Sequence, residues 1–302
     1  MSLEELVEVG GARIQEHASF GARTTYRVGG TVRALVTLSS FADLEELGPL
    51  MLSSGLELFV VGNGSNLLVA DGEHDVLGVH LVGEFEELTT RKQEDVVVVD
   101  AGAGVHLPVA ARRLAKSGVV GFEWAVGVPG SFGGAAVMNA GGHGSDLNES
   151  LVSVTVWHDG TTRTWSPELL DYGYRTSSLR EDDVVIAVRL HLRAGDAEAS
   201  QERIREIVRW RREHQPGGAN AGSAFRNPEG DFAGRLIEEA GCKGLRIGTA
   251  VVSEKHANFI IADADGRGND VYELLTTIQA RVKEHSGVDL VSEHRFLGFE
   301  AP

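Results

Sequence analysis

Two glycine-rich stretches constrain this chain more than any other feature of its sequence. The first, VGNGSNLLVADG, follows an apolar segment at 57–61, and the second extends from Gly121 to Gly144. Glycine lacks a Cβ, so such stretches let the main chain pass close to another group. The chain of 302 residues holds 38 glycines, and their clustering marks places where the backbone has to approach something closely.

The bulk composition is that of an ordinary globular protein with more than one compact unit. The length exceeds that of a usual single domain, and 42% apolar residues suffice for sizeable cores. The formal net charge of −16 argues against a nucleic-acid partner, although local cations and backbone donors could still bind an anionic ligand. No apolar run approaches the roughly 20 residues of a bilayer span, so no membrane partner is expected.

Cysteine and histidine usage excludes two further classes of site. Cys242 is the single cysteine and cannot form an internal disulfide, and the eleven histidines lack metal-binding spacing, so no metal is predicted. Cys242 ends a helical stripe and is predicted to be a packed core residue rather than a nucleophile. The start, MSLEELVEVGG, lacks the segments of a signal peptide, and a cytoplasmic location is expected.

Hydrophobic periodicity predicts an α+β protein whose character changes after residue 192. Strands are predicted at 32–38, 57–61, 77–81, 95–100, 152–157, 184–192, 258–262 and 295–299. Helices are predicted at 41–54, 105–117, 202–214, 232–240 and 270–286. The small polar residues from Arg193 to Ser200 are predicted to form a linker, which places a domain boundary near residue 195.

The first glycine-rich loop stands directly after an apolar strand, where backbone amides can cradle a phosphate. It consists of Gly62, Asn63, Gly64, Ser65 and Asn66. It is neither a dinucleotide fingerprint, because Leu67 takes the third glycine position, nor a P-loop. A plain turn and a glycine-rich connector are the alternative interpretations of the two stretches. Their presence in the same half of the chain favours a nucleotide-type cofactor.

Three further motifs fit the reduction of an enol ether that carries a carboxylate. In Tyr174-Arg175-Thr176-Ser177 a fixed guanidinium can stabilise developing negative charge. In GSAFRNP the hydroxyl of Ser223 can protonate the developing enolate, and in SEHRF Glu293 can polarise the region of the substrate carboxylate. Each motif also has a simpler interpretation: a surface stack, a turn hydroxyl and a solvated carboxylate.

Together the segments VGNGSNLLV, GFEWAVGVPGSFGGAAVMNAG and TYRVGG resemble the UDP-N-acetylenolpyruvoylglucosamine reductase (MurB) family, over Phe20 to Phe299. The resemblance implies an FAD-binding domain of the vanillyl-alcohol-oxidase (PCMH) type at 1–195, in subdomains of about 1–75 and 76–195. It also implies an α+β substrate-binding domain at 196–302. The short stretch between Arg175 and Ser223 is similar to the shorter, type II-like form of the family.

The same resemblance implies a role for each motif residue. Arg175, Ser223 as proton donor and Glu293 would be catalytic. Tyr174, Arg226, Asn227 and His256 would bind substrate, although His256 could equally cap a strand start. FAD would be held by Gly62, Asn63, Gly64, Ser65, Asn66, Gly127, Gly130, Ser131 and Gly134.

The implied reaction is the reduction of UDP-N-acetylglucosamine enolpyruvate to UDP-N-acetylmuramate, in peptidoglycan precursor synthesis. NADPH would reduce FAD, hydride would then pass from the flavin N5 to the substrate, and the enzyme is expected to be a monomer. His143 and His214 depart from the family pattern at ligand contacts. Two alternatives stay open: an oxidase of small hydroxylated molecules on the same cofactor fold, and a non-catalytic nucleotide-sugar binding protein.

Overall fold

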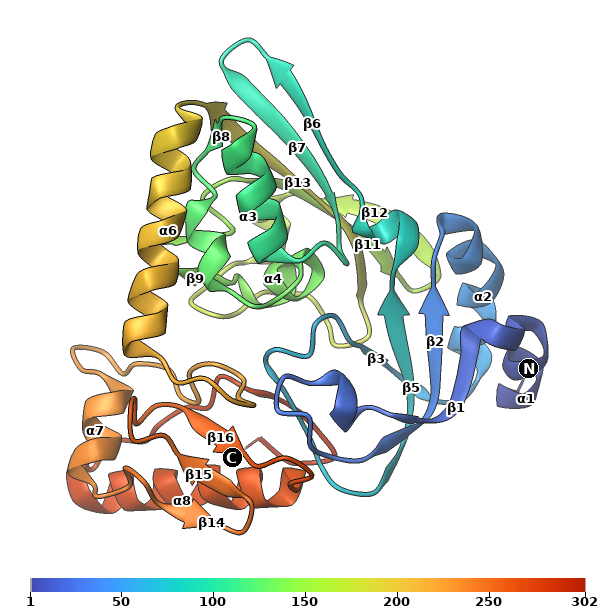
Figure 1. Cartoon of the computed structure of the whole chain (residues 1–302). Coiled ribbons are helices and arrows are strands. Elements are labelled where there is room, and N and C mark those ends of the chain that lie inside the picture. Colours follow the sequence, from blue (N-terminus) through green and yellow to red (C-terminus); the bar gives the residue numbers. More distant parts are fainter. Residues whose placement is uncertain (1, 302) are drawn as a thin grey trace. The chain divides into compact units, whose positions relative to one another are not determined.

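The computed structural model describes residues 2–301, which form two compact units (Figure 1). The first unit contains the described residues up to Glu16, with Arg33–Asn63 and Asp75–Trp210; the second contains His17–Val32, Gly64–His74 and the described residues from Arg211 onward. Both units mix helices and strands, which confirms the α+β class. The chain crosses from one unit to the other several times. Strands β2 (Thr31–Leu38) and β5 (Glu73–Leu81), for example, each have residues in both units. This division therefore differs from the linear one predicted at residue 195.

The predicted linker at Arg193 to Ser200 is wrong. Strand β13 (Val184–Ala194) continues to Ala194, and helix α6 (Ala197–His214) begins three residues later. Asp196 supplies the reason, since its carboxylate accepts hydrogen bonds from the N–H groups of Glu198 and Ala199 in the first turn of the helix. The small polar residues are thus a strand end and a helix start, and helix α6 begins five residues before the predicted one.

The largest sheet of the first unit has the order β12-β11-β13-β7-β6, with β8 also paired to β13. Its neighbouring strands are antiparallel. The sheet confirms the strands predicted at 95–100, 152–157 and 184–192. Its strands are β6 (Leu88–Gln93), β7 (Val96–Gly102), β8 (Val119–Val120), β11 (Leu151–His158), β12 (Thr161–Trp165) and β13.

The second glycine-rich stretch begins after helix α3 of this unit and includes helix α4. Helix α4 (Phe132–Met138) packs on β13 and β7, and α3 (Leu107–Lys116) packs on the short helix η4 (Glu123–Gly127) (Figure 1). After α4 come the two-stranded hairpin β9 (Gly141–Gly142) and β10 (Ser145–Asp146), and later α5 (Pro167–Leu170). The apolar face predicted for the helix at 105–117 is buried: Ala110, Ala111 and Leu114 are at most 2% exposed.

A second sheet has the order β1-β2-β5-β3, in which β3 (Glu57–Val60) is parallel to β5. Strand β1 is Ile14–Ser19. Helix α1 (Leu3–Gly10) packs against α2 (Phe41–Ser53), which the sequence predicts at 41–54. Helix α2 begins with a capping box, in which Ser40 accepts from the N–H of Asp43 and the Asp43 carboxylate accepts from the N–H of Ser40. Hydrogen bonds from Ser39 and Arg13 hold the pKa of Asp43 well below its usual range. Three short helices adjoin the strands of this sheet: η1 (Gly11–Arg13) precedes β1, η2 (Gly21–Arg23) follows β1 and η3 (Gly83–Glu86) follows β5.

The second unit is built on helix α8 (Gly268–Ser286), which packs on strands β14 and β15 and on helix α7 (Ala233–Glu239) (Figure 1). Its apolar stripe is completely buried, as predicted, and consists of Val271, Leu274, Leu275, Ile278 and Val282. The strands are β14 (Arg246–Ile247), β15 (Ala250–Val252) and β16 (Ile260–Ala262), and β17 (Arg295–Leu297) pairs in parallel with β4 (Leu67–Val69). Cys242 is buried in this core, as predicted.

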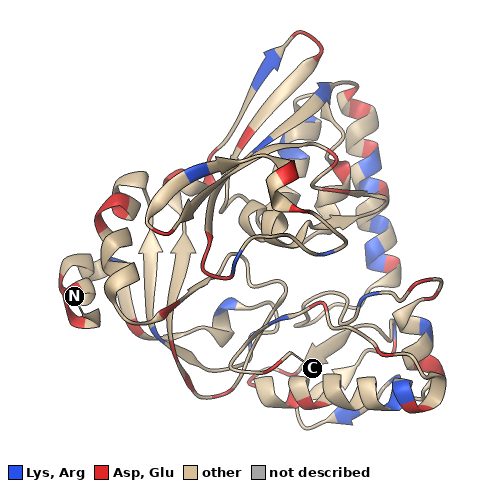
Figure 2. Ribbon diagram, turned by 180° about the vertical axis from the view of Figure 1, so that it is seen from behind, with Lys and Arg blue, Asp and Glu red and all other residues tan. Residues whose placement is uncertain are grey.

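Charged residues of both signs alternate along α6, the long helix coloured blue and red in Figure 2. Arg203 pairs with Glu206 at 3.0 Å and Arg205 with Glu202 at 2.7 Å, and all four side chains are at least half exposed. These pairs are the i, i+3 contacts of a solvated helix face. Within residues 2–301, no helix combines the length and the apolar character needed to cross a bilayer.

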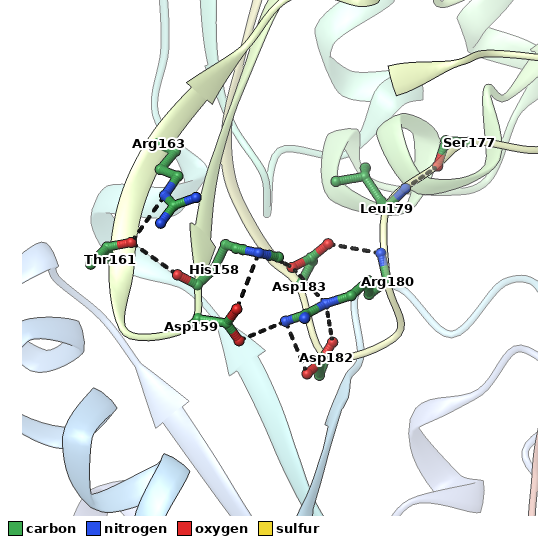
Figure 3. Close-up of polar contacts among 9 residues, drawn as sticks. All are labelled: His158, Asp159, Thr161, Arg163, Ser177, Leu179, Arg180, Asp182 and Asp183. Atoms are coloured by element: carbon green, nitrogen blue, oxygen red, sulfur yellow. Dashed lines mark hydrogen bonds and ion pairs between the residues drawn. The ribbon is translucent and has the colours of Figure 1, made fainter. Parts of the chain in front are cut away.

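A polar cluster joins the turn after β11 to the segment that leads into β13 (Figure 3). The buried carboxylate of Asp183 lies 2.5 Å from His158 Nδ1 and also accepts the N–H of Arg180 at 2.7 Å. Arg180 in turn contacts Asp159 at 2.8 Å and Asp182 at 3.1 Å. Because the buried carboxylate is fully engaged, the segment before β13 enters the sheet at a fixed position.

The capping box of α2 gives a prediction for stability. Ser40→Ala should lower the free energy of unfolding of the protein by about 1 kcal/mol, because the N–H of Asp43 loses its acceptor. Urea denaturation at neutral pH measures the change. Ser53→Ala is the control, since the Ser53 hydroxyl only bonds carbonyls within the same helix. Equal losses in the two variants would contradict the role assigned to the cap.

Candidate active site

In the first unit, the start of the first glycine-rich loop lies directly against the second. The amide of Asn63 donates to the carbonyl of Pro129 at 2.5 Å. A Cβ placed on Gly62 would lie 2.5 Å from the hydroxyl oxygen of Ser131, so a larger residue would force the Ser131 side chain to shift. The N–H of Leu107 donates to the carbonyl of Gly130, which ties the loop to the start of α3. The structure therefore brings together Gly62, Asn63, Gly130 and Ser131, which the sequence assigns to one cofactor site.

Gly134 is exposed within α4, and apart from its chain neighbours and the backbone of its own helix, no atom of the described residues lies within 4 Å of the position its Cβ would take. A glycine inside a helix costs about 1 kcal/mol relative to alanine. Its neighbour Gly133, by contrast, packs against Ala103, where a Cβ would be 3.2 Å away. The open face at Gly134 is where a flat ligand could approach the main chain, and this observation fits the FAD that the sequence predicts.

The rest of the first loop belongs to the second unit. The N–H of Thr25, in the early TYRVGG motif, donates to the carbonyl of Gly64 at 3.1 Å. Asn66 holds the C-terminal motif on both sides of Glu293: its side-chain amide donates to the Glu293 carbonyl at 2.6 Å, and its own carbonyl accepts the N–H of Arg295 at 2.8 Å. Asn66 therefore has a structural function beside the cofactor-binding role predicted for it.

Arg175 stands at the tip of a tight turn in the first unit. Gly173 and Thr176 exchange two backbone hydrogen bonds across the turn, and Arg175 has φ 59°. This left-handed conformation is uncommon for a residue other than glycine. The guanidinium donates to the carbonyl of Gly141 at 2.8 Å and lies 5.0 Å from the centre of the Tyr174 ring. The predicted stack of Tyr174 on Arg175 is thus present, with Tyr174 58% exposed.

Asn139, which the sequence motifs do not mark as a site residue, fixes this turn. It is buried and left-handed (φ 41°) at the end of α4. Its amide donates to the carbonyl of Gly173 at 3.2 Å, its side-chain oxygen accepts the N–H of Asn148, and its own carbonyl lies 3.5 Å from the Arg175 guanidinium. The position of Asn139 inside the second glycine-rich stretch is the only signal in the sequence that could have found it.

In the second unit, the structure brings Ser223 and Glu293 onto adjacent segments. Phe225 and Ser292 form an antiparallel bridge, and the carbonyl of Ala224 accepts the N–H of Glu293 at 2.9 Å. The N–H of Arg226 continues the pairing by donating to the carbonyl of Val291. The two motifs GSAFRNP and SEHRF, about seventy positions apart in the sequence, are therefore neighbours.

A buried asparagine that the sequence analysis did not single out supports the Ser223 segment. The side chain of Asn258 accepts the N–H of Phe225 at 2.9 Å and donates to its carbonyl at 2.8 Å, and its own carbonyl accepts the N–H of Ala224. His256 accepts the N–H of Asn258 at its Nδ1, within the turn that precedes strand β16. Burial lowers the pKa of His256.

The remaining predicted substrate residue, Asn227, is exposed and accepts the N–H of Ala233 at 3.0 Å, which caps the first turn of α7. Among residues 2–301, no group of three His, Cys, Asp or Glu side chains is placed to hold a metal ion. The predicted roles of Tyr174, Arg226, Asn227 and His256 in substrate binding stay predictions.

Comparison with known proteins agrees with this arrangement. A family model described as "FAD binding domain" matches residues 32–165, and one described as "UDP-N-acetylenolpyruvoylglucosamine reductase, C-terminal domain" matches residues 214–297. A UDP-N-acetylenolpyruvoylglucosamine reductase of Synechococcus sp. (strain WH7803) is 40% identical over 299 residues, 96% of this chain and 94% of the relative. One of Heliobacterium modesticaldum is 41% identical over 279 residues, 91% of this chain and 88% of the relative.

A solved structure agrees over nearly the same range. The crystal structure of UDP-N-acetylenolpyruvylglucosamine reductase from Thermus caldophilus superposes with a TM-score of 0.81 at 36% sequence identity. The match covers 94% of this chain and 99% of that one.

The open face at Gly134 gives a prediction for cofactor binding. Gly134→Ala should weaken FAD binding at least about tenfold, because the methyl group occupies the face that the ligand approaches, while the apoprotein keeps or slightly gains stability. Titration of apoprotein with FAD, followed by flavin fluorescence, measures the affinity, and circular dichroism measures Tm.

Gly217→Ala is the matched control, since its Cβ also meets no atom within 4 Å and it lies outside the two glycine-rich loops. An unchanged FAD affinity in Gly134→Ala would show that the open face is not part of the cofactor site.

Proposed function

The chain belongs to the UDP-N-acetylenolpyruvoylglucosamine reductase (MurB) family, and we propose that it reduces UDP-N-acetylglucosamine enolpyruvate to UDP-N-acetylmuramate. The enzyme is an FAD-dependent oxidoreductase with NADPH as the reductant, and the reaction is a step of peptidoglycan precursor synthesis. Both family models and relatives that match more than nine-tenths of the chain support this assignment.

Held by the two glycine-rich loops, FAD would supply the redox chemistry, which is the transfer of a hydride from NADPH to the methylene carbon of the enolpyruvyl group. The new C–H bond leaves an electron pair on the neighbouring carbon, delocalised into the carboxylate. The residues of this chain then have two tasks, which are to stabilise that negative charge and to deliver a proton to the carbon that carries it.

We assign the proton to Ser223 and the carboxylate contact to Glu293. The observation that carries this assignment is the pairing of their segments through the carbonyl of Ala224, which keeps a hydroxyl and a carboxyl group on neighbouring segments of one compact unit. A serine hydroxyl is a weak acid in water, but a positioned hydroxyl can protonate a strongly basic carbon centre. Delivery of the proton forms the second new C–H bond and completes the lactyl ether.

We assign charge stabilisation to Arg175. A guanidinium stays protonated throughout, so it can balance the developing negative charge without giving up a proton. The turn from Gly173 to Thr176 and its contact with Asn139 hold the Arg175 backbone in the left-handed conformation before any ligand arrives. Such preorganisation reduces the cost of ordering the side chain during the reaction.

The finer assignments follow the resemblance. Tyr174, Arg226, Asn227 and His256 bind the nucleotide-sugar in this proposal, and FAD is held by the two glycine-rich loops. All the proposed roles come from residues of a single chain, so the enzyme is proposed to act as a monomer, in the cytoplasm.

One set of measurements tests the reaction. The purified protein should show the visible absorbance of bound flavin, and it should oxidise NADPH rapidly only when the enolpyruvyl substrate is present, forming UDP-N-acetylmuramate. A colourless protein would favour the binding-protein alternative. NADPH oxidation without that product would favour another flavoenzyme.

Ser223→Ala tests the proton donor. Flavin reduction by NADPH should keep its rate, while turnover of the enolpyruvyl substrate should fall by roughly 10²- to 10⁴-fold, because the carbon loses its acid. Anaerobic stopped-flow absorbance separates the two half-reactions. Ser286→Ala is the control, since the exposed Ser286 hydroxyl contacts only the main chain at the end of α8, donating to the carbonyl of Val282 and accepting the N–H of Val288. Loss of both half-reactions in Ser223→Ala would instead make Ser223 a structural residue.

A further inference from the structure

The second unit contains a buried line of polar side chains that the proposed chemistry does not use. The Tyr26 side chain is completely buried, and its hydroxyl lies 3.0 Å from His294 Nε2. The other ring nitrogen, Nδ1, lies 3.1 Å from the hydroxyl of Ser292, which donates to the carbonyl of Ala224 at 3.3 Å. The three side chains come from the early motif and the C-terminal motif, and the line ends on the motif that contains Ser223.

The contacts of Ser292 determine which groups in this line donate hydrogen bonds and which accept them. Its hydroxyl hydrogen points to Ala224, and its oxygen accepts the N–H of His294 at 3.1 Å. The remaining partner, Nδ1 of His294, must then be a donor, because a neutral imidazole has one donor and one acceptor nitrogen. Nε2 is left as the acceptor for the Tyr26 hydroxyl. Every polar atom in the line therefore has a defined role.

Burial keeps this arrangement neutral. It lowers the pKa of His294 to about 4 and raises that of Tyr26. The two rings also stack, with centroids 5.6 Å apart and planes 26° from parallel. Neither ring ionises near neutral pH, so the hydrogen bonds of Ser292 select between the two neutral tautomers of His294.

From this geometry we propose that Tyr26, His294 and Ser292 are positioning residues that fix Glu293 and the Ser223 segment for the proton-transfer half of the reaction. The proposal rests on the proposed function and deepens it. The carbonyl of Ala224 is the shared point, since it accepts both the Ser292 hydroxyl and the N–H of Glu293. Ser223 precedes that residue directly.

The position of Glu293 depends on the neighbouring segments that hold its backbone. Asn66 holds the Glu293 carbonyl at 2.6 Å and Ala224 holds its N–H, so its position depends on the segments to either side. The Tyr26 contact with His294 attaches a third segment, in the early motif, to the same strand. The hydrogen bonds among Tyr26, His294 and Ser292 add to these backbone contacts, and because they are directional they orient the segment more closely than apolar packing would.

Tyr26→Phe tests the proposal because it removes the hydroxyl group and keeps the aromatic ring. The rate of flavin reduction by NADPH should stay within about twofold of the unchanged enzyme. The rate at which the enolpyruvyl substrate reoxidises the reduced enzyme should fall at least about tenfold, with the substrate KM changed less than kcat. Tyr272→Phe is the matched control and should leave both rates unchanged, because its exposed hydroxyl only donates to the carbonyl of Glu300 at 3.2 Å.

A double variant separates positioning from simple core filling. Tyr26→Phe with His294→Leu removes both partners and leaves no unsatisfied ring nitrogen, so Tm should recover relative to Tyr26→Phe alone. The reoxidation rate should stay low, because the directional contacts are absent. Recovery of that rate together with Tm would overturn the proposal.

Nuclear magnetic resonance tests the same line without any substitution. Long-range ¹H–¹⁵N correlation in the unchanged enzyme should show His294 neutral at pH 7 with its proton on Nδ1. A proton on Nε2 would overturn the proposal even if the variants did not fold. No product from the unchanged enzyme would overturn the proposed function and this inference with it. If the unchanged enzyme is active and the substrate reoxidises reduced Tyr26→Phe at the same rate, this inference is overturned and the proposed function stands.

Discussion

In the loops of the candidate site, asparagine side chains supply the hydrogen-bond partners that a neighbouring strand would otherwise provide. A main-chain N–H or carbonyl that is removed from water must find a partner, and the loops of the site have few strands beside them. Asn63 supplies a partner to Pro129, Asn66 to Glu293, Asn139 to Gly173 and Asn258 to Phe225. An amide can donate and accept at once, so each asparagine fixes a loop at a defined distance and orientation.

This use of amides explains how the site can combine glycine-rich sequences with a defined geometry. Glycine allows the close approach at Gly62, and the Asn63 contact stabilises the same approach. The left-handed Arg175 is a local cost that the surrounding contacts of Asn139 offset. In the second unit the same logic continues with hydroxyl and imidazole groups, which direct one strand toward another without placing a charge in the core.

The sequence predicts the regular elements well where burial follows a simple period. The helix with the stripe from Val271 to Val282 and the strand at Val184 are both confirmed, because one face of each is buried. Strand β6 was not predicted, since only Leu88 of its six residues is buried and its existence depends on pairing with β7. The linker at Arg193 was wrong because small polar residues can also cap a helix, as Asp196 does.

The sequence by itself determined the family, the α+β class and the residue types of the chemistry, because glycine-rich loops and short polar motifs are local features that need no tertiary information. Only the tertiary structure decided which segments meet. The pairing of Phe225 with Ser292 and the contact of Tyr26 with His294 join residues that the sequence keeps far apart. Periodicity indicates which face of an element is buried. Hydrogen bonds between loops depend on which distant segments the fold brings together, and the spacing of residues along the chain does not specify these.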